Sequence, residues 1–420
     1  MERYDKYKPS VIEWIGEIPE HWDSKRLKYV ASVQPSNVDK KTIEGELSVF
    51  LCNYMDVYKN EFIDSSINFM EATATEAEIA KFKIKKGDVL VTKDSETPDD
   101  IANPAFVKDD FENVNVICAY HLTQIRPNRS ELIGEYLFRL FQETKYKGQF
   151  EVAANGVTRF GLSVSAFSDA FVPLPRPKEQ TAIAKYLDEK TAQIDTLIEK
   201  KQKLIELLKE ERTAIINQAV TKGINPKAKL KPRGIEWLGD IPKHWEVKKL
   251  KYVARLKSGD SITADSIRDE GEYPVFGGNG LRGYTSAYSH EGDFVLIGRQ
   301  GALCGNINYA KGKFWASEHA VVVTPIARYN LIWVGELLCT MNLNQYSQSA
   351  AQPGLAVEKI QNLFIPVPSI EEQNSISAYI EAETQKLDAT ISKIEKEIEL
   401  LQKYRTALIS EVVTGEIKVI

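Results

Sequence analysis

The sequence predicts an α+β protein in which one structural plan occurs twice. Two variable domains in a pseudo-two-fold arrangement are each followed by a long helix, and the two helices form an antiparallel coiled coil. Three observations predict this fold: a block near the start of the chain recurs in its second half, another block recurs after each variable stretch, and a coiled-coil pattern follows each copy of that second block. Repeats of this kind indicate a duplicated architecture.

The first repeated block covers residues 12–31 and 235–254. Its two copies, IEWIGEIPEHWDSKRLKYVA and IEWLGDIPKHWEVKKLKYVA, are identical at 14 of 20 positions. Each copy contains a His-Trp pair, at His21 and at His244. Because the two histidines are equivalent in the repeat, we expect them to have a structural role.

The second repeated block begins at residues 171–180 and 364–373, where FVPLPRPKEQ matches FIPVPSIEEQ. About 40 residues without Pro or Gly follow each copy, which predicts a helix with proline just outside its start. Apolar residues then recur at steps of three, four or seven, the period of a coiled coil. The residues predicted at the helix interface are Leu187, Ile194, Ile198, Ile205 and Leu208 in the first helix, and Leu387, Ile391, Ile394, Ile398 and Leu401 in the second.

At about 1.5 Å per residue each helix is about 60 Å long, and alone it cannot bury its apolar stripe. A core helix of an ordinary domain is the alternative, but heptad spacing over this length favours packing of the two helices against each other. The predicted segments are a first variable domain at 1–178, a first long helix at 179–222, a linker at 223–234, a second variable domain at 235–370, and a second long helix with a C-terminal tail at 371–420.

The stretches between the repeated blocks, residues 32–170 and 255–363, show no obvious similarity to each other. Short β-rich runs, two of them preceded by a Gly-Asp turn, predict strands within these stretches. The predicted strands lie within 86–92, 114–125, 291–298 and 320–324. Two unlike domains in equivalent positions suit the recognition of two different targets with one geometry.

Composition excludes several classes of protein. With 420 residues and 43% hydrophobic content, the chain can bury the cores of two or three domains. It has no apolar run of about 20 residues and no apolar signal stretch at its start, so we expect no membrane association and a cytoplasmic location. Its four cysteines are scattered, without metal-ligand or disulfide spacing. The first 178 residues carry 23 basic and 28 acidic side chains, so a nucleic-acid surface there must be a local patch.

Taken together, these features resemble the specificity subunit of a type I restriction-modification system. The resemblance rests on the repeated IEW-x-G-x-IP-x-HW block, the Pro-x-Pro-x-x-x-Glu-Gln junctions, the two long helices and the two divergent stretches, and it spans nearly the whole chain. It implies a chain without catalytic residues. The variable domains would be target-recognition domains that each bind half of a split, asymmetric sequence in double-stranded DNA, with the helices as the spacer.

The resemblance also implies partners. Two methyltransferase subunits, which use S-adenosylmethionine to methylate adenine N6, would dock on the helices. Restriction subunits that act as motors and nucleases, with ATP and Mg, can join the assembly. The chain itself is therefore expected to hold neither a cofactor nor a metal.

DNA recognition requires Lys and Arg for phosphates, and Arg, Asn or Gln for base edges. The candidates lie mainly on glycine-rich stretches at 277–284 and 298–301 of the second domain. In the first domain they lie directly after the β-rich run at 86–92 and shortly before the second repeated block. They are Asn279, Arg282, Tyr284, Arg299, Gln300 and Lys313 in the second domain, and Lys93, Thr158 and Arg159 in the first. For each residue of the glycine-rich stretches alone, a solvated side chain on an ordinary turn is the alternative. Both stretches resemble recurrent features of recognition domains of the family, which favours DNA contact for their residues as a group.

Three other functions match parts of the sequence. FGGNG at 276–280 and NPAF at 103–106 approach the motifs of a free-standing DNA methyltransferase, but the glycine loop does not open a helix and the second catalytic proline is missing. A nuclease would need more than the Pro-Asp-Asp at 98–100, which lacks a following Glu-x-Lys. A protein-binding scaffold explains the helices and leaves the two divergent stretches unexplained.

Overall fold

The computed structural model describes residues 2–11, 15–112, 114–232, 237–301, 303–326, 328–347 and 354–419. The start of each copy of the first repeated block, at 12–14 and 235–236, lies outside the described residues. The chain forms two compact units: unit 1 comprises Met1–Lys200 with Lys396–Ile420, and unit 2 comprises Lys201–Glu395. Each unit therefore contains one variable domain and part of both long helices.

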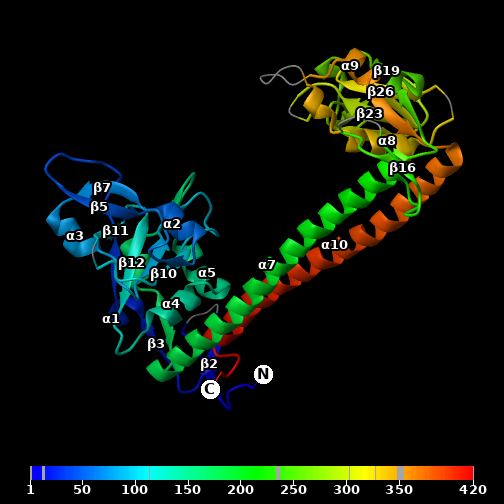
Figure 1. Cartoon of the computed structure of the whole chain (residues 1–420). Helices are drawn as coiled ribbons and strands as arrows, with labels where there is room; N and C mark the ends of the chain where they lie inside the picture. The colour runs from blue at the N-terminus through cyan, green and yellow to red at the C-terminus, as the bar shows by residue number, and fades with distance from the viewer. Residues whose placement is uncertain are drawn as a thin grey trace. The chain divides into compact units, whose positions relative to one another are not determined.

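Unit 1 is built on a mixed five-stranded sheet (Figure 1). Its strands in spatial order are β4 (Ala31–Pro35), β12 (Leu122–Pro127), β8 (Val89–Thr92), β10 (Pro104–Val107) and β6 (Phe62–Ile63). Because side chains alternate along a strand, Val89 and Val91 pack in the core that contains helix α4 (Gly134–Phe141), whereas Leu90 packs on the opposite face. A second sheet of β11 (Val116–Cys118), β5 (Leu47–Cys52) and β7 (Met70–Ala74) contributes to that opposite core.

Unit 2 contains a sheet of the same design with four strands. In spatial order they are β19 (Ala254–Ser258), β26 (Ala320–Pro325), β23 (Phe294–Gly298) and β24 (Ile307–Ala310). Val295 and Ile297 pack in the core with helix α8 (Leu331–Thr340), and Leu296 packs on the other face. The second sheet here consists of β21 (Gly280–Thr285), β20 (Tyr273–Gly277), β25 (Lys313–Ala316) and β22 (His290–Glu291).

The two main sheets have the same strand register. The equivalent residue pairs are Ala31–Pro127 and Ala254–Pro325 between the first two strands, and Ile125–Val89 and Val323–Val295 between the next two. The two variable stretches, which show no obvious similarity in sequence, therefore fold around a common core sheet.

Most of the strands predicted from sequence are present. Those expected in 86–92, 291–298 and 320–324 are β8, β23 and β26. The expectation of one strand over 114–125 is wrong, because a turn at residues 120–121 divides this stretch into β11 and β12, which belong to different sheets.

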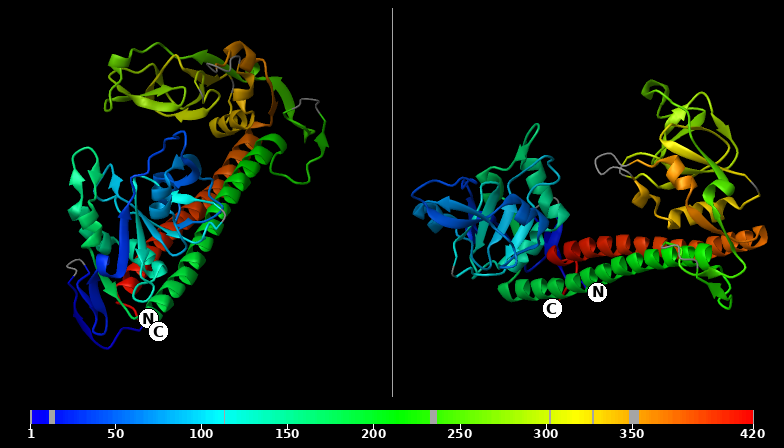
Figure 2. Two further views of the ribbon diagram at one scale, coloured as in Figure 1. Left: turned by 90° about the vertical axis from the view of Figure 1, so that its left-hand side faces the viewer. Right: turned by 45° about the horizontal axis from the view of Figure 1, so that its top comes forward.

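Two long helices follow the variable domains, α7 (Pro177–Lys222) and α10 (Ile370–Val413). They lie side by side and run antiparallel (Figures 1 and 2). In unit 1, Arg405 of α10 bonds to Asp195 of α7 at 2.9 Å, and in unit 2, Arg212 of α7 bonds to Asp388 of α10 at 3.0 Å. The predicted α+β fold, with two domains and two paired long helices, is confirmed.

Helix α7 begins at Pro177, two residues before the predicted start. Pro175 lies just outside the helix, as expected, and Pro177 occupies its first position. Proline is tolerated in the first turn, since the backbone N–H that it lacks would have no partner within the helix.

The glutamines of the second repeated block attach each variable domain to its long helix. Gln180 accepts a hydrogen bond from the backbone N–H of Ile133 at 2.9 Å, and Gln373 accepts one from Asn330 at 3.0 Å. Ile133 and Asn330 directly precede α4 and α8. Both glutamine side chains are buried, so each bond fixes the start of a domain helix to the start of a long helix.

The glutamates beside them bind the histidines of the first repeated block. Glu179 is buried, accepts a hydrogen bond from Trp22 Nε1 at 3.0 Å and lies 3.0 Å from His21 Nε2. Glu372 lies 2.9 Å from His244 Nε2 in the same way. The predicted structural role of the two equivalent histidines is confirmed.

Candidate nucleic-acid interface

The third strand of each main sheet, β8 in unit 1 and β23 in unit 2, ends at an equivalent place in the fold. Lys93 follows β8 and Arg299 follows β23, and the common register makes the two positions equivalent. The backbone N–H of Lys93 donates to the carbonyl of His121 at 3.1 Å, and that of Arg299 donates to His319 at 2.8 Å. Two candidates from different variable stretches thus occupy one position in the common fold.

The residues that follow Lys93 and Arg299, namely Asp94 and Gln300, are also equivalent in the two units. Asp94 pairs with Gly161, and Gln300 forms a bridge with Gly354. We call these sets the sheet corners: Lys93, Asp94 and His121 in unit 1, and Arg299, Gln300 and His319 in unit 2.

The two glycine-rich stretches of unit 2 meet at its sheet corner. A Cβ on Gly298 would lie 2.0 Å from the carbonyl oxygen of Gly278, so the two backbones can approach this closely only because residue 298 is glycine. Asn279 is exposed, and its Oδ1 accepts a hydrogen bond from Asn306 at 3.0 Å. The structure therefore brings together Asn279 and the corner residues, as base readers on a common surface require.

Replacing Gly298 by alanine is expected to separate these two loops. The added Cβ would overlap a backbone oxygen that cannot rotate away, so we expect a loss of about 1–3 kcal/mol in the free energy of unfolding. Chemical denaturation measures this loss. Gly161→Ala is the matched control, because a Cβ there meets nothing within 4 Å; equal losses in both variants would contradict the tight approach.

Arg299 and Gln300 present different surfaces. The Arg299 side chain is half-buried, and its Nη1 donates to Ser258 Oγ at 3.2 Å. Gln300 is exposed. Arg282 is exposed too, its stem lies close over Gly277, and its guanidinium has no hydrogen bond or ion pair within the described residues. Of the two candidate arginines in the second domain, Arg299 is thus anchored, and Arg282 is unpaired within the described residues.

Tyr284 and Lys313 belong to the second sheet of unit 2. Tyr284 is half-buried in β21 and its backbone pairs with Arg268. Lys313 is exposed at the start of β25, with its Nζ 4.7 Å from the ring centroid of Tyr288. An exposed ammonium group of this kind suits a phosphate contact.

Lys93 of unit 1 is turned toward its own fold. Its Nζ donates to the carbonyl of Ser36 at 2.8 Å and lies 4.3 Å from the ring centroid of Tyr120. Burial lowers the pKa of this ammonium group. In this structure Lys93 therefore holds the sheet corner together.

Thr158 and Arg159 are exposed at the turn of a hairpin formed by β13 (Asn155–Gly156) and β14 (Phe160–Gly161). Arg159 Nη2 lies 2.5 Å from Asp94 Oδ1, and His121 Nδ1 lies 2.8 Å from Asp94 Oδ2. The structure thus places Arg159 at the corner of unit 1, although it is 65 residues from Asp94 in the chain.

Sequence reasoning missed Asp94 and gave His121 no role. One signal was present: both sheet-corner histidines begin a run that ends in proline six residues later, at Pro127 and Pro325. In the structure these runs contain the equivalent strands β12 and β26.

Acidic side chains gather beside the corner of unit 1. A hollow of about 450 Å³ is lined by Asp94, Glu96, Asp100 and Arg159, together with two tyrosines. The tyrosine rings, Tyr54 and Tyr58, stack with centroids 5.5 Å apart. Some of the excess acidic residues of the first domain therefore lie at its candidate binding surface.

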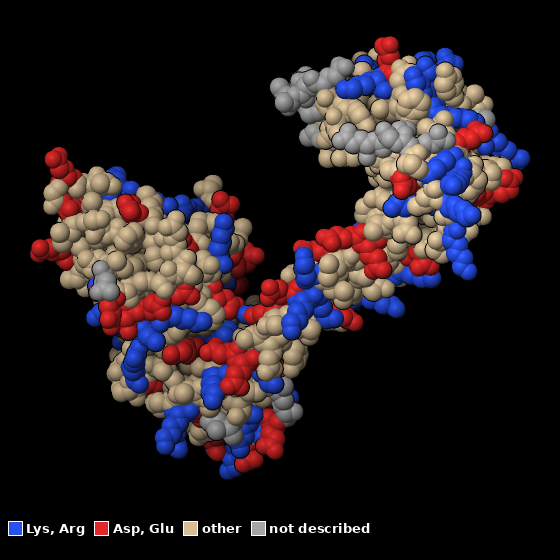
Figure 3. All heavy atoms as spheres, in the orientation of Figure 1, with Lys and Arg blue, Asp and Glu red and all other residues tan. Residues whose placement is uncertain are grey.

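Figure 3 shows the charges on one face of the molecule. Groups of Lys and Arg lie along the top and right-hand side of the visible face of unit 2, among uncharged and a few acidic side chains. The visible face of unit 1 has a broad area without charged side chains, bordered by mixed charges. Charged side chains are therefore unevenly distributed over the visible face of each unit.

The ten predicted interface residues of the long helices are all at least half-buried. Leu187, Ile194, Ile205, Ile391 and Ile394 are buried, and Ile198, Leu208, Leu387, Ile398 and Leu401 are half-buried. Other large apolar side chains remain exposed on these helices, namely Leu197, Leu204 and Leu207 on α7 and Tyr379, Leu400 and Tyr404 on α10. The helices therefore keep apolar surface available after pairing.

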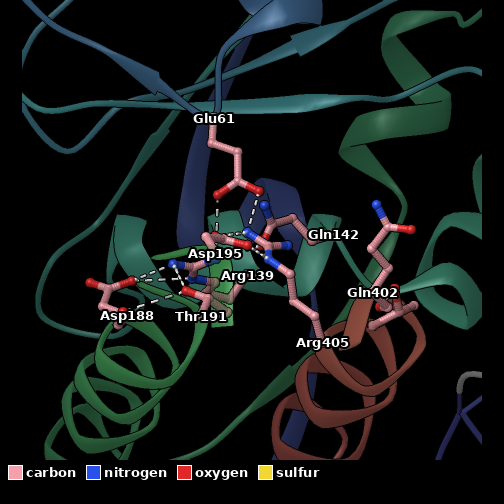
Figure 4. A network of polar contacts seen from close by, with 9 residues as sticks. Glu61, Arg139, Gln142, Asp188, Thr191, Asp195, Gln402 and Arg405 are labelled. Carbon is pink, nitrogen blue, oxygen red and sulfur yellow. Dashed lines mark hydrogen bonds and ion pairs between the residues drawn. The ribbon is translucent and has the colours of Figure 1, made fainter. Parts of the chain in front are cut away.

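A polar network attaches the first domain to both helices (Figure 4). Buried Arg139 of α4 donates to Asp188 of α7 at 2.7 Å. Arg405 of α10 donates to Asp195 of α7 and, at 2.6 Å, to Glu61 of the domain. The burial of Arg139 makes this attachment specific, since its charge has to be paired.

Within the described residues, no group of three or more His, Cys, Asp and Glu side chains is arranged to hold a metal ion. No helix in the described part of the chain is long and apolar enough to cross a membrane.

The chain matches the family model for the type I restriction modification DNA specificity domain at residues 19–207 and again at 242–400. The chain belongs to this family. Each match includes one variable domain with its sheet corner, so both corners lie in specificity domains.

Relatives of the specificity family match the chain over different lengths. It is 25% identical to the putative type I restriction enzyme MjaX specificity subunit of Methanocaldococcus jannaschii, over 96% of both chains. It is 49% identical to the EcoprrI specificity subunit of Escherichia coli over 138 residues, which are 32% of this chain and about a third (34%) of that relative.

Solved structures share the fold. A chain from a study of complex assembly and conformational transition of the type I R-M system has a TM-score of 0.68 at 20% identity, covering 95% of this chain and 99% of that one. The HsdS subunit from Thermoanaerobacter tengcongensis has a TM-score of 0.57 at 19% identity, with 95% and 98% covered.

Proposed function

We propose that this specificity-family chain binds a split, asymmetric sequence in double-stranded DNA, with one half-site at each sheet corner. The observation that carries this proposal is the equivalence of the corners. One fold presents Lys93 and Asp94 in unit 1 but Arg299 and Gln300 in unit 2. A common scaffold gives both domains the same docking geometry, and the side chains that each corner presents to solvent, Arg159 beside Asp94 in unit 1 and Arg299 with Gln300 in unit 2, read different bases.

The chain acts in this proposal as a non-catalytic subunit in the cytoplasm. Two methyltransferase subunits that carry S-adenosylmethionine modify adenine N6 at the bound target, and restriction subunits that use ATP and Mg join them. The exposed apolar residues of α7 and α10 give the methyltransferase subunits a surface to bury. The chain needs no cofactor or metal of its own.

Salt dependence distinguishes a DNA reader from a protein-binding scaffold. We expect the complex of this chain with its methyltransferase to lose about 10³- to 10⁵-fold in affinity for target DNA between 50 and 200 mM salt, because Lys and Arg release counterions from phosphates. Fluorescence anisotropy on a labelled duplex measures this. Absence of DNA binding at the lower salt, from a complex that assembles normally, would favour the scaffold.

The proposed target is found by mapping methylation. The chain is co-expressed with the methyltransferase encoded beside it, and N6-methyladenine is located across the host genome by single-molecule sequencing. We expect a split, asymmetric motif methylated on both strands that disappears when this gene is deleted. A stable complex that methylates no motif would contradict the proposal.

A further inference from the structure

We infer that Arg159, held in place by Asp94, reads a guanine in the half-site bound by the first domain, and that Asp94 is its positioning residue. This inference rests on the proposed DNA-binding function. It adds the base chemistry that the sheet corner of unit 1 recognises and a role for a residue that does not itself need to touch DNA.

The backbone places the two residues together. Arg159 directly precedes β14, whose Gly161 pairs with Asp94 and whose Phe160 pairs with Ser95 in strand β9 (Asp94–Ser95). The side chain of Asp94 is only 14% exposed, whereas that of Arg159 is 58% exposed. A largely buried carboxylate therefore binds one terminal nitrogen of a solvent-facing guanidinium.

Both oxygens of the Asp94 carboxylate are already engaged. Oδ1 lies 2.5 Å from Arg159 Nη2, and Oδ2 lies 2.8 Å from His121 Nδ1. The carboxylate therefore orients the arginine and is poorly placed to accept a hydrogen bond from a base. Arg159 Nη1 and Nε have no partner within the described residues, so the guanidinium keeps donors for a ligand.

The chemistry of a braced arginine favours guanine. A guanidinium presents parallel donors, Nη1 with Nη2 or Nε with Nη2, that match the O6 and N7 acceptors of guanine in the major groove. Asp94 takes one of the two hydrogens of Arg159 Nη2, so the other can complete such a pair. Holding the side chain in one orientation removes rotamer freedom before binding, which strengthens the contact and makes it sensitive to position.

The surroundings argue against a phosphate as the ligand of Arg159. Asp94, Glu96 and Asp100 line the same hollow as Arg159, and their carboxylates repel a phosphate group. A base edge is neutral, so it can approach this arginine without that repulsion.

The sheet corner of unit 2 provides an internal comparison. Gln300 occupies the position of Asp94 there and has no carboxylate to brace an arginine. A change at Asp94 should therefore affect one half-site, and the other half-site reports on the integrity of the complex.

The experiment uses the complete complex of this chain with its methyltransferase and DNA libraries randomised separately in each half-site. Methylated molecules are sequenced to obtain base preferences, and binding is measured by competition. We expect the wild-type complex to require guanine at one position of the first half-site. Arg159→Ala should reduce that preference about 5- to 150-fold, and Asp94→Asn should reduce it by a smaller factor, with the second half-site unchanged in both.

Arg159→Lys separates base reading from phosphate binding. Lysine keeps the positive charge but lacks the two parallel donors of arginine. If Arg159 reads a base, this variant should therefore show a weaker guanine preference and a nearly unchanged salt dependence of DNA binding. A lysine variant that keeps the guanine preference would overturn the inference, as would Arg159→Ala or Asp94→Asn variants with an unaltered first half-site. If the wild-type complex selected no motif at all, the proposed function itself would fail.

Discussion

Replacing Arg299 by alanine is expected to weaken binding of the target DNA about 5- to 150-fold, the effect of one lost bidentate base contact. The loss should relax base preference in the second half-site only, because Arg299 lies at the sheet corner of unit 2. Competition binding with duplexes altered in one half-site at a time measures both effects. The bond from Arg299 to Ser258 keeps the guanidinium at the corner before DNA arrives.

The matched control is Arg255→Ala. Arg255 is exposed in β19 of the same sheet, so its replacement removes the same charge away from the corner. We expect this control to leave base preference unchanged. An Arg299→Ala variant that relaxed the first half-site, or both half-sites equally, would contradict the assignment of one half-site to each corner.

Replacing Arg139 by alanine is expected to lower the free energy of unfolding of unit 1 by about 3 kcal/mol. Arg139 is 1% exposed and donates to Asp188, Thr191 and Gln142. Breaking a buried ion pair costs about 3–5 kcal/mol, and the lower end applies because Asp188 is half exposed. Hydrogen exchange of the α4 amides and chemical denaturation measure the loss.

Arg212→Ala is the control for this prediction. Arg212 pairs with Asp388 between the same two helices, but both side chains are substantially exposed. Exposed pairs contribute at most about 1 kcal/mol. Equal losses in the two variants would show that the burial of Arg139 is not what makes the network important.

The helices and their attachments could be predicted from sequence because their signals are local. Heptad spacing of apolar residues requires a partner helix whatever lies elsewhere in the chain, and the structure pairs α7 with α10. The repeated His-Trp pair indicated a structural role for the two histidines, which the contact of His21 with Glu179 explains.

The similarity of the two variable domains could not be read in the same way. A buried strand such as β8 or β23 requires only apolar side chains on both faces, so equivalent strands need not share residues. Register is a property of the pairing between strands, so it is defined only in the folded chain, where β12 pairs with β8 and β26 pairs with β23.

By itself the sequence determined the duplication, the paired helices and the family, because these depend on patterns that repeat within or along the chain. Only the tertiary structure decided which candidates share a site. It turned Lys93 toward Ser36, placed Arg299 at the equivalent position, and brought Asp94 to Arg159 across 65 residues. These contacts follow from the sheet register, and no local pattern in the sequence specifies which distant residues a register will bring together.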